Sequence, residues 1–429
     1  MDTATLWLMP TSRHSTFGVR GSGGSGDLRQ GNLTSILRYI RDHGSSSRHD
    51  IAQGCGLGIS TMTDLIAELR SRRLVKELDP IRRPAAGRPT RPIALDGEPW
   101  LALGVHLDID RVRFTAVTVG GREIWTDAVP QDLRGVGAAG YDTVRDIILR
   151  GLSMLPGDKE LLAVEVGVPG YVERDTGTVT WSAGLDWRDF PLGQLVGDAL
   201  GRVGIRNIHV GIANDCQLAG LHACRAELGL PSDSIAVYLG GIRGIGSSVI
   251  IGGEIYRGAH GSAGDFGHRT VWPGGTPCWC GRDGCLATAA GLAHLVAETA
   301  PMSRAEAEAA VHAHPAQAVQ SVLDAAAGGE ERALATLAGA GDALGYVLDD
   351  VLGVINPHTA ILGGFLGVLS PYLLPRIEER LGVRRSLAAF APTAVVGLEK
   401  VVPRVARGGA LAARDACLND PLGLTRPLG

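Results

Sequence analysis

Apolar residues near the start of the chain recur with the three- and four-residue spacing of helices. The first such stripe consists of Leu33, Ile36, Leu37 and Ile40. Ser47 and Asp50 then have the spacing of a helix-capping serine and its acidic partner, and residues 54–56 form a glycine-rich turn. A second stripe after this turn consists of Met62, Leu65, Ile66 and Leu69. The pattern therefore predicts three helices, of which the last begins near Ile59.

The last of these helices leaves small polar side chains on its outer face. They are Ser60, Thr61, Thr63 and Asp64. Two short helices around a glycine turn, the second with hydroxyl side chains outside, are typical of a helix-turn-helix that enters the major groove of DNA. A plain three-helix packing unit has the same apolar pattern. The helices alone therefore do not distinguish a DNA-binding unit from a packing unit, and the residues that follow them are needed for this distinction.

Two short apolar segments, residues 74–78 and 92–95, predict the strands of a wing, and a basic loop separates them. Arg88 in this loop lies in a Gly-Arg-Pro element that suits the narrow minor groove of A·T-rich DNA. The wing and the loop favour DNA binding over the packing unit. We therefore predict a winged helix-turn-helix domain over residues 29–97, after a flexible leader over residues 1–28. The residues expected to contact DNA are Ser47, Arg48, Ser60, Thr61, Thr63 and Arg88.

After Trp100 the pattern changes to short apolar strands that alternate with helices. Three strands with tight turns come first, a strand and helices follow, and this order starts again at about Ser234. The repeat predicts an α+β or α/β fold of two lobes that face each other across a cleft, over residues 98–232 and 233–418. The other expected elements are a strand over 205–211, a helix over 214–226, a helix over 404–417 that completes the second lobe, and a tail over 419–429.

Composition and charge restrict the classes of protein to consider. Hydrophobic residues make up 45% and charged residues 20% of the 429 residues, which excludes disorder for the bulk of the chain. The net charge is −4, but residues 29–95 hold twelve Lys and Arg against six Asp and Glu, so a basic module is joined to an acidic body. The sequence lacks a membrane-spanning stretch and a signal-peptide pattern. We therefore expect a cytoplasmic protein that contacts nucleic acid at one end.

Three of the seven cysteines lie within eight residues of one another, and a histidine precedes them. His268, Cys278, Cys280 and Cys285 provide one imidazole and three thiolates on a glycine-rich loop. Four N and S ligands without a free coordination position are typical of a closed, tetrahedral, structural Zn²⁺ site. The other cysteines are expected to be small core residues, because an odd number of cysteines without a secretory signal argues against a disulfide framework.

The sequence around these ligands resembles the signature of the ROK family of repressors and sugar kinases. The resemblance rests on residues 258–291 (GAHGSAGDFGHRTVWPGGTPCWCGRDGCLATAAG), residues 166–170, Asn214-Asp215, residues 355–357 and residues 361–364. The N-terminal module resembles that of the NagC/Mlc-like and XylR-type transcriptional repressors of this family. The resemblance implies an actin-like ATPase (ROK sugar kinase-like) fold of two lobes, a sugar site in the cleft, and homodimers or homotetramers.

Kinases of the family open their first hairpin with an Asp-x-Gly-Gly-Thr segment that holds the phosphates of ATP. The matching residues here are 106–110 (HLDID), where both glycines are lost and Asp108 and Asp110 place negative charge beside the phosphate position. The second phosphate loop, residues 240–246, is longer than the family form and only partly kept. Because phosphoryl transfer depends on positioning and charge neutralisation, we expect no kinase activity. A sugar kinase with an accessory DNA-binding module is the alternative.

The resemblance also implies a sugar site that binds an effector. Its residues are Asn214, Asp215, Asp265 and His268. Asp215 matches the catalytic base of the kinases, and Asp265 stands where the family has a glutamate. Gly184 and Ala287 replace a family asparagine and glutamate, which removes hydrogen bonds and leaves room for a bulkier ligand. The opposing interpretation is a relic cleft in which Asp215 merely caps the helix that it begins.

These observations predict a transcriptional repressor that responds to a sugar or a sugar-derived effector. The expected partners are double-stranded operator DNA, a small carbohydrate-like effector and further copies of the chain, without a membrane. A regulator that is switched by a partner protein docked on the zinc loop, without a small ligand, is a further alternative.

Overall fold

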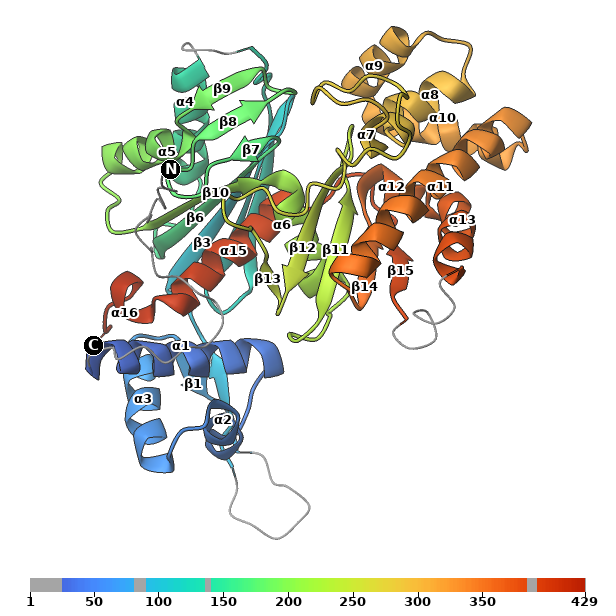
Figure 1. Ribbon diagram of the computed structural model, residues 1–429. Coiled ribbons are helices and arrows are strands. Elements are labelled where there is room, and N and C mark those ends of the chain that lie inside the picture. The colour runs from blue at the N-terminus through green and yellow to red at the C-terminus, as the bar shows by residue number, and fades with distance from the viewer. Residues whose placement is uncertain (1–24, 81–89, 136–139, 384–391, 429) are drawn as a thin grey trace, which may run out of the picture.

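The computed structural model describes residues 25–80, 90–135, 140–383 and 392–428. A small helical unit lies beneath two α/β lobes, which stand side by side (Figure 1). Within the described residues, no helix is both long enough and apolar enough to cross a membrane.

The helical unit at the N-terminus has the elements expected from the apolar stripes. It consists of α1 (Ser25–His43), α2 (Arg48–Cys55), α3 (Ile59–Ser71), β1 (Val75–Glu77) and β2 (Ile93–Leu95). The two strands pair antiparallel, and the stripes of α1 and α3 are buried in one common core. Ser47 caps α2, because its hydroxyl accepts a hydrogen bond from the backbone N–H of Asp50 (3.1 Å).

Helix α1 begins at Ser25, so the expected leader over residues 1–28 was too long at its C-terminal end. Residues 1–24 lie outside the described residues. Gly26 and Gly31 have low helix propensity and concealed the first turns from the sequence pattern. The helix is supported there by Asp27, which suits the positive end of the helix dipole, and by Arg29, whose Nε donates to Glu68 of α3 (2.7 Å).

The first lobe is built on a five-stranded sheet with the order β10-β6-β3-β4-β5. Its strands are β3 (Trp100–Leu107), β4 (Arg111–Thr118), β5 (Glu123–Pro130), β6 (Glu160–Val168) and β10 (His209–Asn214). Strands β3, β4 and β5 are antiparallel, whereas β6 and β10 continue the sheet in parallel. Helices α4 (Gly140–Ser153) and α5 (Leu192–Arg202) share an apolar core with this sheet.

Two features of the first lobe differ from the expected pattern. A small sheet of β7 (Tyr171–Val172), β8 (Val179–Ser182) and β9 (Trp187–Phe190) was missed, because strands of two to four residues show no clear alternation. Strand β10 begins at His209 and not at residue 205, because Asn207 has a positive φ of 55° and holds the preceding residues in a turn.

The second lobe repeats the plan of the first, with the sheet order β13-β12-β11-β14-β15. Its strands are β11 (Ile235–Gly240), β12 (Gly246–Ile251), β13 (Glu254–Ile255), β14 (Thr359–Leu362) and β15 (Ala394–Gly397). Its helices are α7 (Leu286–Ala289), α8 (Leu292–Thr299), α9 (Arg304–Ala313), α10 (Pro315–Ala327), α11 (Glu331–Val354), α12 (Gly364–Val368) and α13 (Ser370–Gly382). Thus the repeated order of strands and helices corresponds to two sheets of the same topology.

The helix that ends each lobe packs against the sheet of the other lobe. Helix α6 (Asp215–His222) follows β10 and packs on β11 and β12, whereas α15 (Val405–Asn419) follows β15 and packs on β3, β4 and β6 (Figure 1). The expectation that α15 completes the second lobe was therefore wrong. Gly104 permits the contact, because a Cβ atom there would lie 1.9 Å from the carbonyl oxygen of Ala406.

The helical unit is joined to the lobes through the end of the chain. Leu33 and Ile36 of α1 belong to the same buried cluster as Trp100 and Leu418. The expected tail is in fact ordered as α16 (Pro421–Leu424), and the backbone N–H of Leu428 donates to Ser71 at the end of α3 (2.8 Å). The N-terminal unit and the first lobe therefore share a core.

Candidate functional site

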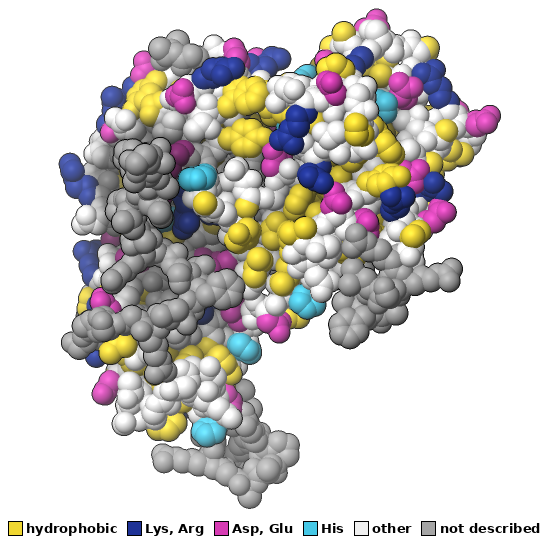
Figure 2. Space-filling model, viewed as in Figure 1, with side chains coloured by type: hydrophobic (Ala, Val, Ile, Leu, Met, Phe, Trp, Pro, Cys, Tyr) yellow, Lys and Arg dark blue, Asp and Glu magenta, His cyan; other side chains and the backbone are white. Residues whose placement is uncertain are grey.

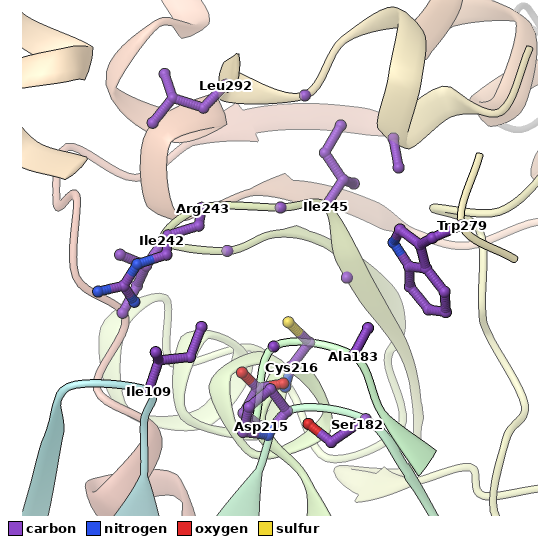
Figure 3. A pocket seen from close by; sticks show the side chains of 18 of the residues that line it. Ile109, Ser182, Ala183, Asp215, Cys216, Ile242, Arg243, Ile245, Trp279 and Leu292 are labelled. Carbon is purple, nitrogen blue, oxygen red and sulfur yellow. The ribbon is translucent and has the colours of Figure 1, made fainter. Parts of the chain in front are cut away.

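A cleft with a volume of about 1220 Å³ lies between the two lobes. In the space-filling view, hydrophobic and basic side chains gather between the lobes (Figure 2). Asp215 lies between Arg243 and Trp279, which are on opposite sides of the pocket (Figure 3). The structure brings all four expected effector residues to the wall of this cleft, namely Asn214, Asp215, Asp265 and His268.

Ion pairs between residues 108–110 and the loop at residues 240–246 cross one end of the cleft. Arg243, from the loop between β11 and β12, places Nη1 3.0 Å from Asp108 Oδ1 and Nη2 3.0 Å from Asp110 Oδ2. Arg113 contacts the other oxygen of Asp108 (3.1 Å). Burial would raise the pKa of Asp108, but His106, Arg243 and Arg113 lower it, so this carboxylate is charged at neutral pH.

The sequence showed the two carboxylates but not their partner. Arg243 was visible only as a single cation in a glycine-rich loop, and its pairing needs the two lobes to face each other. Its guanidinium now holds together two carboxylates that would otherwise repel. A nucleotide phosphate at this end of the cleft would have to displace an existing arginine–carboxylate network.

The floor of the cleft is the start of α6. Asn214 is the N-cap of this helix, since its side-chain oxygen accepts from the backbone N–H groups of Cys216 (2.9 Å) and Gln217 (3.3 Å). Its Nδ2 donates to the carbonyl oxygen of Gly170 (3.0 Å). Asn214 therefore performs the capping role that the relic interpretation gave to Asp215.

Asp215, the first residue of α6, opens onto the cleft and is partly exposed. One carboxylate oxygen accepts from the backbone N–H of Cys216 (2.8 Å). Its burial among the cleft walls raises its pKa to about 6, and the nearby charge of Asp108 adds to this shift. Above about pH 6 the side chain is therefore a carboxylate that can accept hydrogen bonds from hydroxyl groups, and below this pH it is protonated.

The opposite wall carries Asp265, which is already bonded across the cleft. The hydroxyl of Tyr171 in β7 donates to Asp265 Oδ2 (2.7 Å), and burial together with this bond raises the pKa of the tyrosine. Tyr171 was not predicted as a site residue, because nothing in its sequence neighbourhood indicates that β7 faces the second lobe. Tyr171 and Arg243 thus link the lobes at two places in the cleft.

The two positions that lack the family's polar side chains differ from each other. Ala287 is partly exposed and lines the cleft. At Gly184 an added Cβ atom would lie 2.9 Å from Cδ1 of Ile109, so that isoleucine already takes part of the space. Gly184 lines the cleft as well, so both positions border the space in which extra room was expected, with the apolar side chain of Ile109 beside residue 184.

His268, Cys278, Cys280 and Cys285 come together as expected, with ligand atoms that all lie within 4.8 Å of one another. Cys278 Sγ is 3.4 Å from His268 Nδ1, and Cys280 Sγ is 3.6 Å from Cys285 Sγ. Tetrahedral Zn²⁺ with bonds of about 2.3 Å to sulfur requires sulfur atoms roughly 3.8 Å apart, so this donor set fits the metal.

The backbone of this candidate metal-binding loop depends on glycine. Gly284 has a φ of 62°, and an added Cβ atom would lie 1.7 Å from the carbonyl oxygen of Trp272. The loop is closed by isolated bridges between Thr270 and Cys285 and between Pro277 and Asp283. Its fold thus brings together ligands that are up to 17 residues apart in sequence.

The residues expected to contact DNA differ in their exposure to solvent. Ser60, Thr61 and Thr63 are exposed on α3. Arg48 on α2 is exposed and pairs with Glu77 of β1. Ser47 is buried, and its hydroxyl donates to Asp50 (2.7 Å), so its role is to cap α2 and not to meet DNA. Arg88 lies outside the described residues.

The fold and the cleft define a two-lobed protein of the sugar kinase type, with a His/Cys cluster that could hold a metal ion and an additional N-terminal helical unit. The model of the ROK family matches residues 140–410, and the chain belongs to this family.

Relatives of two kinds are similar to the chain. The DNA-binding transcriptional dual regulator NagC of Escherichia coli is 24% identical, over 95% of this chain and 98% of its own. A glucokinase of Halalkalibacterium halodurans is 27% identical, over 65% of this chain and 84% of its own. The crystal structure of a ROK family transcriptional regulator, a homologue of the E. coli Mlc protein, has a TM-score of 0.72 and 21% identity, over 92% of this chain and 98% of that one.

Proposed function

We propose that this protein is a transcriptional repressor that binds double-stranded operator DNA through its N-terminal unit and responds to a sugar or sugar-derived effector in the cleft. The observation that carries the proposal is the pairing of Arg243 with Asp108 and Asp110, which fills the phosphate end of the cleft while Asp215 stays open to it. A cleft of this kind is suited to bind a sugar without phosphorylating it.

The N-terminal unit supports DNA binding. We infer a winged helix-turn-helix in which α3 is the recognition helix and the β1–β2 hairpin is the wing. Ser60, Thr61 and Thr63 are available for bases and phosphates, while Arg48 and Arg70, both held by Glu77, flank this surface for phosphate contacts. The match to NagC includes this unit, whereas the glucokinase match covers only 65% of the chain.

Structural Zn²⁺ and self-association complete the proposal. Zn²⁺ held by His268 and the three cysteines would fix the loop that follows Asp265 at the border of the cleft. All four protein ligands are used, so the metal is given no part in a reaction. A homodimer or homotetramer places two recognition helices at a defined spacing, as operators with two half-sites require.

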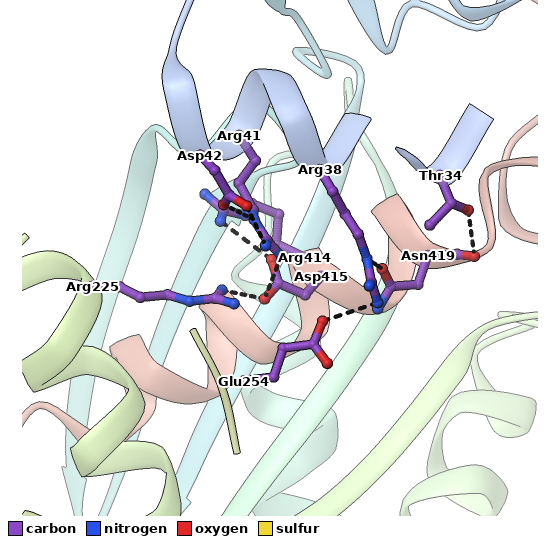
Figure 4. A network of polar contacts seen from close by, with 9 residues as sticks. All are labelled: Thr34, Arg38, Arg41, Asp42, Arg225, Glu254, Arg414, Asp415 and Asn419. Carbon is purple, nitrogen blue, oxygen red and sulfur yellow. Dashed lines mark hydrogen bonds and ion pairs between the residues drawn. The ribbon is translucent and has the colours of Figure 1, made fainter. Parts of the chain in front are cut away.

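A helical segment that starts at the cleft is linked to the N-terminal unit through a buried carboxylate. Helix α6 starts at Asp215 and continues as the π-helix η1 (Ala223–Glu227), which carries Arg225. Arg225 bonds to the buried Asp415 of α15, and Arg41 of α1 lies 3.4 Å from the same carboxylate (Figure 4). We propose that movement of α6 on effector binding reaches α1 through Asp415.

A second contact at this junction comes from the other lobe. Arg38 of α1 lies 2.9 Å from Glu254 of β13, and its Nε donates to the side chain of Asn419 (2.8 Å) at the end of α15 (Figure 4). Helix α1 is thus bonded to both lobes, so a change in their relative position would alter its orientation.

The second candidate function is a sugar kinase, which is favoured by Asp215 at the position of the catalytic base and by the glucokinase relative. A coupled ADP-release assay with glucose, xylose and N-acetylglucosamine tests it, with Asp215→Ala as control. The repressor proposal predicts no ADP release above that control. Turnover that depends on Asp215 would establish the kinase.

DNA binding is tested separately by selecting DNA from a random pool with the full-length protein. The proposal predicts a recurrent sequence with two half-sites, and binding that is lost when Thr61 and Thr63 are both changed to alanine. A pool without an enriched sequence would contradict the assignment of the N-terminal unit.

A further inference from the structure

At the end of the cleft opposite Arg243, a tryptophan is held in a fixed position and remains open to solvent. Trp279 lies between the ligands Cys278 and Cys280, and 52% of its surface is exposed. Its ring meets the ring of His268 nearly at a right angle (centroids 4.4 Å apart) and that of Trp181 in β8 in the same way (4.6 Å). It lines the cleft (Figure 3).

We propose that Trp279 forms a second carbohydrate subsite, so that the effector is an oligosaccharide or glycoside of at least two rings and not a monosaccharide. In this arrangement one ring bonds to Asp215, and the next ring packs against the indole. This inference rests on the proposed function, since it names the class of ligand that the same cleft would bind.

The chemistry of the indole fits a sugar ring. One face of a pyranose presents several C–H groups, whose weak positive charge suits the electron-rich face of an aromatic ring, while the hydroxyl groups remain free for hydrogen bonds. Single exposed apolar side chains need no explanation on a protein surface. Here, however, the exposed ring borders a cleft and is supported by a second tryptophan from the opposite lobe.

The indole is also fixed before a ligand arrives. Both of its chain neighbours are candidate metal ligands, and the guanidinium of Arg188 lies 5.5 Å from the ring centre of Trp181 behind it. Binding to a rigid surface loses little conformational entropy, which favours affinity. The rings of Trp181 and Trp279 come from different lobes, so a sugar bound beside them would also affect how the lobes face each other.

The size of the cleft and its chemistry near Gly184 agree with a longer ligand. Pockets for drug-sized molecules have about 300–1,000 Å³, and a single hexose is much smaller than such molecules, whereas this cleft has about 1220 Å³. Ile109 beside Gly184 offers no hydrogen bond to a first ring. Contacts with a second sugar ring would compensate for this missing hydrogen bond.

The test compares saccharides of different length on the full-length, metal-loaded protein. Titration calorimetry with glucose, cellobiose, maltose, xylose, xylobiose, N-acetylglucosamine and chitobiose covers the common linkages. We expect at least one disaccharide to bind at least about tenfold more tightly than its own monosaccharide. Trp279→Ala should remove this advantage and leave the affinity for the monosaccharide unchanged.

Trp272→Ala is the matched control, because Trp272 lies in the same loop, is 41% exposed and packs on Tyr346. It should leave all affinities unchanged, and the zinc content of both variants should equal that of the wild type. A monosaccharide that binds as tightly as every disaccharide, or a Trp279→Ala variant with intact zinc that weakens both alike, overturns the subsite alone. Absence of binding by every saccharide overturns the proposed effector and the subsite together.

Discussion

Replacement of Asp415 by asparagine should uncouple the N-terminal unit, which we propose to bind DNA, from the cleft. The carboxylate is buried and contacts Arg41, Arg225 and Arg414. Two opposite charges 4 Å apart attract by about 4 kcal/mol at an effective dielectric constant of 20, but burial of the charges offsets much of this energy. Loss of one partner from a buried ion pair costs about 3–5 kcal/mol, because the remaining charges stay buried. We expect Asp415→Asn to lower the free energy of unfolding by about 3 kcal/mol, the lower limit of this range.

The assay is a thermal melt combined with DNA binding in the presence and absence of effector. Asp415→Asn should lower Tm by roughly 5 °C and reduce the effect of the ligand on DNA affinity. Glu254→Gln is the matched control at the same junction, since its pair with Arg38 is more exposed and is worth about 0.5 kcal/mol. If Asp415→Asn is as stable as Glu254→Gln and responds to the ligand like the wild type, the proposed route through Asp415 is refuted.

Three further changes have defined outcomes. Cys285→Ser should lose Zn²⁺, measured by elemental analysis, and lower Tm, since metal binding contributes to loop folding; absence of zinc in the wild type would contradict this. Arg88→Ala should weaken DNA binding and relax the preference for A·T pairs in footprints; an unchanged footprint would argue against a minor-groove contact. Effector affinity should fall as pH decreases through about 6, because protonated Asp215 no longer accepts hydrogen bonds as a carboxylate. Asp215→Asn should remove this pH dependence. An identical pH profile of effector affinity in both proteins would exclude this role of Asp215.

Local patterns predicted most of the elements correctly. The structure confirms the apolar stripes that contain Leu37 and Leu69 and the cap at Ser47, all of which depend on neighbouring residues. The proximity of three of the four candidate metal ligands was also predictable, because Cys278, Cys280 and Cys285 lie within eight residues of one another. Such features need no knowledge of the tertiary fold.

Contacts between distant segments were not predictable in this way. The apolar face of α15 shows that the helix is buried, but not which sheet covers it. Likewise, Arg243 and Asp415 acquire their roles only from partners more than 130 residues away. Trp279 could have been noticed in the sequence, since a large aromatic residue between two metal ligands is held in place by both.

The central claim is that the cleft senses a ligand and changes the grip of the N-terminal unit on DNA. Mobility-shift titrations of selected operator DNA with wild type and Asp215→Ala, with and without the saccharide that binds the wild type, test it most directly. We expect equal DNA affinity for both proteins without ligand, and a ligand-induced change in affinity of at least about fivefold in the wild type only. A variant that responds at the same ligand concentration as the wild type would show that the cleft is not the sensor.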